Sequence, residues 1–60
     1  MNWKPHTEHP DHAPESVLIA GYDILAELYI WNGSNFLNEV TGFPVNPDIQ
    51  FWWILESELL

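Results

Sequence analysis

The sequence predicts a mainly β domain: a three- to four-stranded antiparallel meander preceded by an extended N-terminal arm, with a small α+β fold as the alternative. Apolar runs rich in β-branched and aromatic residues have the length of strands. An Asn-Gly pair between two of these runs is typical of a β-hairpin. Prolines recur near the start of the chain, where they disfavour a helix. We therefore divide the chain into an arm, residues 1–16, and a small antiparallel β domain, residues 17–60.

The arm has an unusual spacing of prolines. Pro5, Pro10 and Pro14 lie at short intervals, and each restricts the residue before it. We expect an extended and partly disordered segment. Trp3 is its apolar residue, and we expect this side chain to dock on the β domain.

The strands follow in order along the β domain. Residues 17–21 are apolar and β-branched, which predicts a buried strand. Residues 24–31 fit either a strand or a helix, and the β-preferring end of the segment followed by Asn32-Gly33 favours the strand. Residues 34–40 then return as the next strand. Residues 41–48 contain Gly and Pro and indicate a loop. Residues 57–60 form a short tail with room for one helical turn.

The last strand, residues 49–56, carries a large apolar group on both of its faces. Adjacent strand residues point to opposite faces, so one indole of the Trp52-Trp53 pair can enter the core while the other points outward. Core positions for both indoles, on the two sides of a covered sheet, remain the alternative. A sheet of this size has few residues with which to cover two faces, so a second copy or a target is expected on an uncovered one.

The chain is short for a stable domain. Its 60 residues contain no cysteine, which excludes disulfides and thiolate metal sites. Domains of this size have a marginal core and often need additional stabilisation. Four tryptophans supply large apolar area, so aromatic packing takes the place of crosslinks.

The charge is strongly one-sided. Lys4 is the only basic side chain against nine acidic ones, and the net charge is −8 at pH 7. Such a field repels nucleic acid and anionic membranes and attracts basic partners. No signal peptide is visible, and no apolar stretch approaches the roughly 20 residues of a membrane span. We expect a cytoplasmic protein that contacts neither nucleic acid nor membrane directly.

The order of the elements resembles a family of short phage- and prophage-encoded proteins known as the domain of unknown function number five-five-one. The similar features are a starting Trp and a proline-bearing arm, an apolar strand, a Tyr/Trp hairpin and a late Trp strand, here Trp3, Pro14, Val17-Leu18-Ile19, Tyr29-Ile30-Trp31 and Phe51-Trp52-Trp53. The family's His before the late Trp is absent, and residues 56–60 replace its Leu-Pro-rich ending. The resemblance implies a phage or mobile-element origin and supplies no functional residues.

Catalytic and metal chemistry find little support. His6, His9 and His12 are spaced by three with carboxylates between them, a set of metal-ligand types. Pro10 opposes the helix that would align them, so we interpret them as a solvated polar tail. The carboxylates lack a nucleophile or a structured His beside them. We therefore expect no enzyme, no metal and no cofactor.

Two functions fit these features. The first is a small acidic phage or mobile-element protein that binds and inhibits a host protein, a nucleic-acid-handling defence factor, by imitating nucleic acid on its basic surface. The second is a homodimeric structural or assembly module without inhibitory activity. For the first, a carboxylate surface would bind the partner with an aromatic anchor, from the candidates Glu27, Glu39, Asp48, Trp52, Trp53, Glu56 and Glu58.

Overall fold

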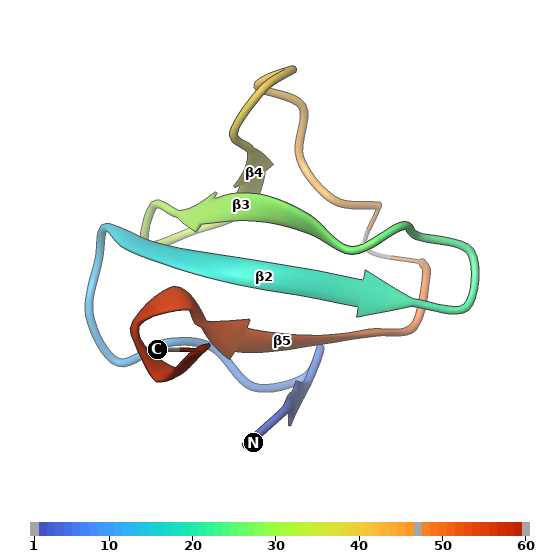
Figure 1. Ribbon diagram of the computed structural model, residues 1–60. Coiled ribbons are helices and arrows are strands. Elements are labelled where there is room, and N and C mark those ends of the chain that lie inside the picture. Colours follow the sequence, from blue (N-terminus) through green and yellow to red (C-terminus); the bar gives the residue numbers. More distant parts are fainter. Residues whose placement is uncertain (1, 47, 60) are drawn as a thin grey trace.

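The computed structural model describes residues 2–46 and 48–59 as one five-stranded antiparallel sheet with a short 3-10 helix (Figure 1). The strand order across the sheet is β1-β5-β2-β3-β4. The mainly β prediction is therefore confirmed. The elements are β1 (Lys4–Pro5), β2 (Glu15–Gly21), β3 (Glu27–Trp31), β4 (Phe36–Asn38), β5 (Phe51–Leu55) and η1 (Glu56–Leu59).

β2 is the centre of the sheet. Its β-branched and apolar residues suit a strand with neighbours on both sides, and Val17 lies opposite Tyr29 of β3 and Leu55 of β5. β2, β3 and β4 form the expected meander. β5 then returns to pair with β2 instead of extending the meander beyond β4, and the arm contributes β1 along the other side of β5. The sheet thus has five strands where three or four were expected.

The ambiguous segment 24–31 divides into a loop and a strand. Residues 27–31 form β3, so the strand interpretation is confirmed there, and η1 confirms the helical turn in the tail. The predicted β3–β4 hairpin is also present. Asn32 Oδ1 accepts hydrogen bonds from the backbone N–H groups of Ser34 and Asn35 at 2.8 and 2.7 Å, and Gly33 has a φ of 99°, which favours glycine.

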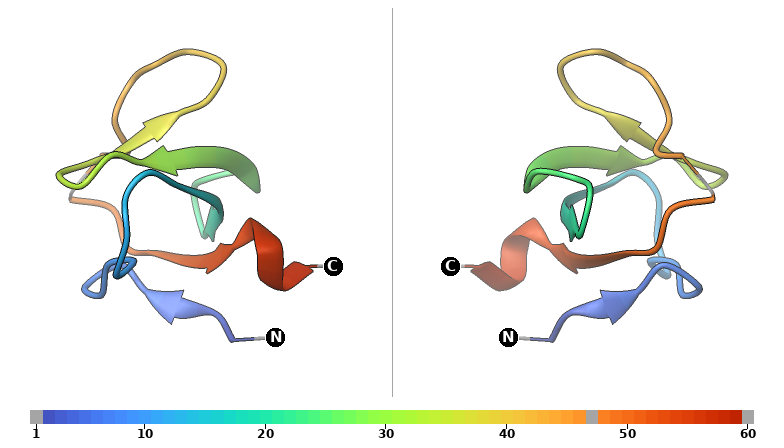
Figure 2. Two further views of the ribbon diagram at one scale, coloured as in Figure 1. Left: turned by 90° about the vertical axis from the view of Figure 1, so that its left-hand side faces the viewer. Right: turned by 90° about the vertical axis from the view of Figure 1, so that its right-hand side faces the viewer.

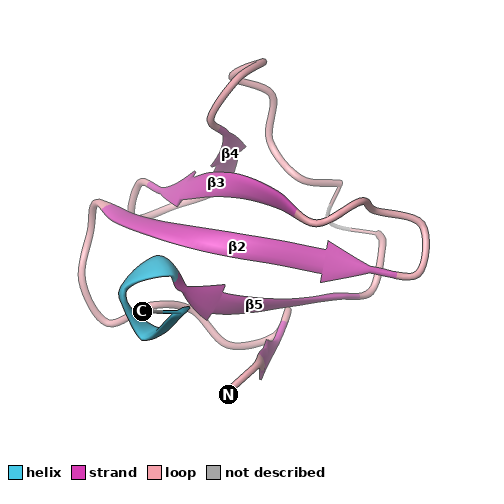
Figure 3. Cartoon of the chain, viewed as in Figure 1, coloured by secondary structure: helices cyan, strands magenta, loops and turns pink. Residues whose placement is uncertain are grey.

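The residues between β4 and β5 form the predicted loop, with residue 47 outside the described part. Pro44 makes an isolated bridge to Leu37, which shields the outer edge of β4. Gly42 has a φ of 78° and closes a turn with its N–H donating to the Asn38 carbonyl at 2.8 Å. The loop then crosses the sheet to β5 (Figure 3).

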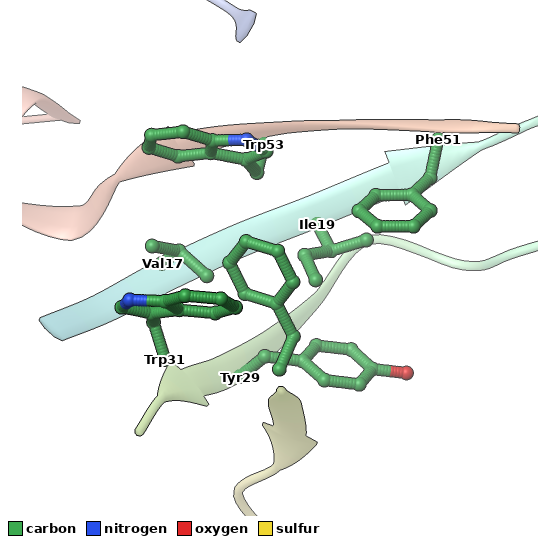
Figure 4. Close-up of a cluster of buried hydrophobic side chains, with 7 residues drawn as sticks. Val17, Ile19, Tyr29, Trp31, Phe51 and Trp53 are labelled. Carbon is green, nitrogen blue, oxygen red and sulfur yellow. The ribbon is translucent and has the colours of Figure 1, made fainter. Parts of the chain in front are cut away.

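One face of the sheet, the inner face, holds the core. Its side chains from β2, β3 and β5 point toward one another in Figure 4, and Phe36 of β4 completes the cluster. Alternation along each strand places these residues on the same side. The core consists of Val17, Ile19, Tyr29, Trp31, Phe36, Phe51 and Trp53.

Different segments cover the two faces. The arm and the segment before β5 lie over the inner face, whereas η1 lies on the opposite, outer face (Figure 2). η1 packs on β2 and β5 and leaves Ile54 fully buried. Elsewhere on the outer face, Leu28 is exposed and Ala20 and Trp52 are half-buried.

Candidate functional site

The Trp52-Trp53 pair is divided between the two faces. Trp53 lies in the core with 1% of its surface exposed, and its Nε1–H donates to the Glu8 carbonyl of the arm at 2.9 Å. Its position opposite Ile19 places it in the middle of the inner face. Trp53 is therefore inaccessible to a partner, which corrects its inclusion among the binding candidates.

Trp52 is the outward member of the pair. It lies opposite Ala20 on β2 and Pro5 on β1, and it is half-buried. The Tyr22 ring meets Trp52 edge-on, with centroids 5.6 Å apart and an interplanar angle of 83°. Tyr22 itself is 85% exposed. Trp52 thus belongs to an aromatic group that is open to solvent.

This group surrounds an open hollow of about 330 Å³ on the outer face. Three large rings line it, and the small residues Ala20 and Gly21 complete the lining. We call it the aromatic hollow, defined by Trp3, Ala20, Gly21, Tyr22 and Trp52. The arm's Trp3 was expected to dock on the β domain, and it lines this hollow with 38% of its surface exposed.

Glu27 and Glu39 lie beside each other at the start of β3. They line a common hollow with Leu28 and Val40, and both carboxylates are exposed. The Asn38 side chain holds Glu27, because its Nδ2 donates to Glu27 Oε2 at 3.0 Å, and its Oδ1 accepts from the N–H groups of Val40 and Thr41. The backbone N–H of Glu39 donates to the Leu28 carbonyl at 3.1 Å, which keeps Glu39 beside β3. We call Glu27 and Glu39 the first acidic pair.

The remaining candidate carboxylates lie elsewhere. Glu56 and Glu58 are exposed on η1. The expected continuation of the last strand through Glu56 is wrong, because the chain turns into a 3-10 helix at this residue. Glu56 lines a hollow with Glu15 of β2, and we call these two the second acidic pair. Asp48 is exposed in the loop before β5, with its N–H bonded to Asn46 Oδ1.

The two acidic pairs are separate patches. Glu27 lies opposite Ile19, whereas Glu15 begins β2 opposite Trp31. Four residues of strand separate these positions, which is about 13 Å. This exceeds the Debye length of about 8 Å at physiological ionic strength, so the pairs act largely independently on a partner. The carboxylates expected on one surface are thus exposed but divided.

Two of the three histidines contact the core, which corrects the interpretation of the arm as a solvated tail, whereas His12 is exposed as expected. The His9 ring stacks on Trp31 with centroids 4.7 Å apart and 10° between the planes, and His6 lies 5.5 Å from Phe51. Both rings thus cover the core from the arm. Within residues 2–46 and 48–59, no group of three His, Cys, Asp or Glu side chains is arranged to hold a metal ion.

Asn38 is a residue that the sequence interpretation missed. It lies within a segment expected to be strand to residue 40, but its side chain closes the turn that ends β4. An Asn that bonds the backbone two residues ahead is a known turn signal. The signal is present in the sequence, but the apolar residues Phe36 and Leu37 before it favoured a longer strand.

Comparison with known proteins gives no relative for this chain. No family model matches it, and no curated protein or solved structure is significantly similar. In the part of the chain that the structure describes, no helix has the length and apolarity to span a membrane.

Proposed function

We propose that this chain is a binding protein, not an enzyme, and that its target is the basic surface of another protein. One observation carries the proposal. The net charge is −8, and all five candidate carboxylates are exposed on a folded surface that also presents a group of outward aromatic rings. Ordered charges and large aromatic side chains are the two components that interfaces use for steering and for affinity.

The two acidic pairs suit a partner with separated cationic groups. The first pair, in which Asn38 holds Glu27, lies toward one end of β2, and the second lies at the other end. Because each patch is screened from the other, each attracts its own Lys or Arg cluster. A protein that binds a nucleic-acid backbone presents several Lys and Arg side chains along its channel to neutralise phosphates.

We propose further that this chain is a phage or mobile-element protein that acts in the cytoplasm of a host cell. It inhibits a nucleic-acid-handling defence factor by occupying that factor's basic channel. The small size and the acidic surface support this role, as does the resemblance of the element order to phage-encoded proteins. Trp52 is the aromatic anchor of the contact.

The test is affinity capture of a bacterial protein at low and high salt, followed by competition with duplex DNA. We expect a captured partner that is basic, is lost at high salt and releases DNA when this chain is added. A partner that is held equally well at high salt, or that keeps its DNA, contradicts the proposal.

Charge-neutralised variants sharpen this experiment. Glu27→Gln with Glu39→Gln removes the first acidic pair, and Glu56→Gln with Glu58→Gln removes charge at the other end. Each double variant is expected to weaken capture and to reduce its salt dependence. Lys4→Gln is the matched control, because it removes a charge of the opposite sign and should leave capture intact.

A second candidate is the homodimeric structural or assembly module. Two exposed apolar residues that line one hollow favour it: Leu28 on the outer face is 38% exposed, and Val40 in the turn after β4 is 91% exposed. Such residues beside an uncovered sheet face are typical of an interface. The charge of the chain opposes pairing of two identical copies, so we place this candidate second.

A further inference from the structure

Three aromatic rings line the aromatic hollow, and the chain that carries it has a strongly negative net charge. Trp3 comes from the chain just before β1, Trp52 from β5 and Tyr22 from the turn after β2, so three separate segments converge on it. A volume of about 330 Å³ lies at the lower end of the range for ligand pockets, roughly 300–1,000 Å³. The hollow is open and has room for one side chain of a partner.

The exposure of these rings is the unusual feature. Tyr22 keeps its edge-on geometry against Trp52 while 85% of its surface faces solvent. Aromatic residues that serve only the core are buried, as Trp53 is on the inner face. Half-exposed rings gathered around a hollow are typical of a contact that a partner completes.

Charge decides which chemical group fits. Aromatic faces attract cations, and Arg stacks on rings more readily than Lys because its guanidinium is planar and more weakly hydrated. Asp23 follows Tyr22 directly, and the whole chain contributes a net charge of −8. Lys4, the only basic side chain, lies opposite Trp53, so the alternation of the strand places it on the inner face. Its ammonium group therefore does not occupy the hollow in place of a partner's cation.

We infer that the aromatic hollow receives an arginine side chain from the basic partner. The guanidinium stacks against Trp52 and Tyr22, with Trp3 closing the third side, and its charge is balanced by the field of the chain. This inference rests on the proposed function and identifies the group that the aromatic anchor contacts. The acidic pairs attract the partner, and the hollow fixes its register.

The experiment uses the whole chain and short capped peptides with alternating Gly and Arg. Matched peptides replace Arg with citrulline, which has the same shape without charge, or with Lys. Calorimetry measures the affinity, and NMR shifts of the Trp52 and Tyr22 ring protons report the site. We expect binding in the order Arg, then Lys, then citrulline, with the largest shifts at these two rings.

Variants separate the hollow from general charge attraction. Tyr22→Ala removes an exposed ring with little risk to the fold, and it should weaken binding of the Arg peptide by about 3- to 30-fold. Trp52→Phe keeps an aromatic ring and should weaken binding less than Trp52→Ala. Phe43→Ala is the control, since Phe43 is 72% exposed and lies outside the hollow.

The inference is overturned by equal binding of the Arg and citrulline peptides, by equal binding of the Arg and Lys peptides, or by an unchanged affinity in Tyr22→Ala. If the carboxylate variants still weaken capture of the basic partner in any of these cases, the proposed function stands and the hollow is not its anchor. If the carboxylate variants also have no effect, the proposed function fails as well. Tighter binding of a neutral proline-rich peptide would likewise reject an arginine site.

Discussion

Trp52 and Trp53 are neighbours of identical chemistry that have opposite surroundings. The pleat of β5 sends one ring into the core and the other to the outer face. Trp53 is further fixed by its hydrogen bond to the arm, whereas Trp52 contacts the exposed ring of Tyr22. The cost of removing each ring is therefore expected to differ strongly.

Trp53→Ala should destabilise the chain by about 3–5 kcal/mol, because it removes a fully buried ring from the core. A domain of this size has a total stability of about the same amount, so the variant should be largely unfolded. Trp52→Ala should cost only about 1–2 kcal/mol, since its ring is half-buried. Urea unfolding followed by circular dichroism measures both. A greater loss in Trp52→Ala than in Trp53→Ala would contradict the assignment of the two faces.

Asn38 carries several interactions in one buried side chain. It is 8% exposed, donates to Glu27 and accepts from the N–H groups of Val40 and Thr41. Asn38→Leu should therefore destabilise the chain by about 1–3 kcal/mol, because the turn loses its acceptor. Thermal unfolding measures the loss.

Asn38→Asp separates the two roles of this side chain. The carboxylate keeps its acceptor for the turn but cannot donate to Glu27, and it places a second negative charge beside that carboxylate. Adding Glu27→Gln should restore part of the stability lost in Asn38→Asp, since the glutamine amide can donate to the new carboxylate. A double variant less stable than Asn38→Asp alone would show that the Glu27 contact has no such role.

At the scale of elements, the arm acts as a cover for the core. Its backbone accepts the Trp53 indole N–H at Glu8, and its His9 ring lies flat on Trp31. His9→Ala should destabilise the chain by about 0.5–1.5 kcal/mol through the lost stack on Trp31. His12→Ala is the matched control, because among the described residues His12 stacks on no core ring, and it should change stability by less than about 0.5 kcal/mol. Equal effects of the two variants in urea unfolding would show that the arm is not a cover.

Local patterns in the sequence predicted most individual elements. β-branched and aromatic residues indicated β2 and β5, and Asn32-Gly33 indicated the hairpin. The position of β5 beside β2 was not predictable, because it depends on a register between segments about thirty residues apart in the chain. The role of the arm was missed for the same reason: Pro5 suits an edge strand, but nothing nearby in the sequence identifies β5 as its neighbour.

The candidate site was predictable to a similar degree. Alternation predicted that one of the two indoles points outward, but only the register shows that it is Trp52. The exposure of the carboxylates followed from their charge. Their division into two acidic pairs follows from the sheet, because Glu15 and Glu27 are brought to opposite ends of β2 by the β2–β3 pairing.

At the scale of the whole molecule, two surface properties oppose each other. The outer face presents apolar and aromatic residues such as Leu28 and Trp52, which favour association. A net charge of −8 on a chain of 60 residues opposes association with an identical copy and favours association with a basic partner protein. If the charge dominates, the chain is a monomer that binds a basic partner, as the inhibitor proposal requires. If the apolar outer face dominates, the chain is a homodimer.

Salt concentration therefore changes the expected state of the isolated chain. At low salt, sedimentation velocity should show a monomer, because repulsion between copies extends beyond the contact distance. At about 1 M salt the Debye length falls to about 3 Å, and weak self-association through the outer face should become measurable. Leu28→Gln should reduce this association, whereas Phe43→Ala, on the loop after β4, should not. A stable dimer at low salt that Leu28→Gln disrupts would instead establish the homodimeric module, because burial of the outer face would then outweigh the repulsion of the charges.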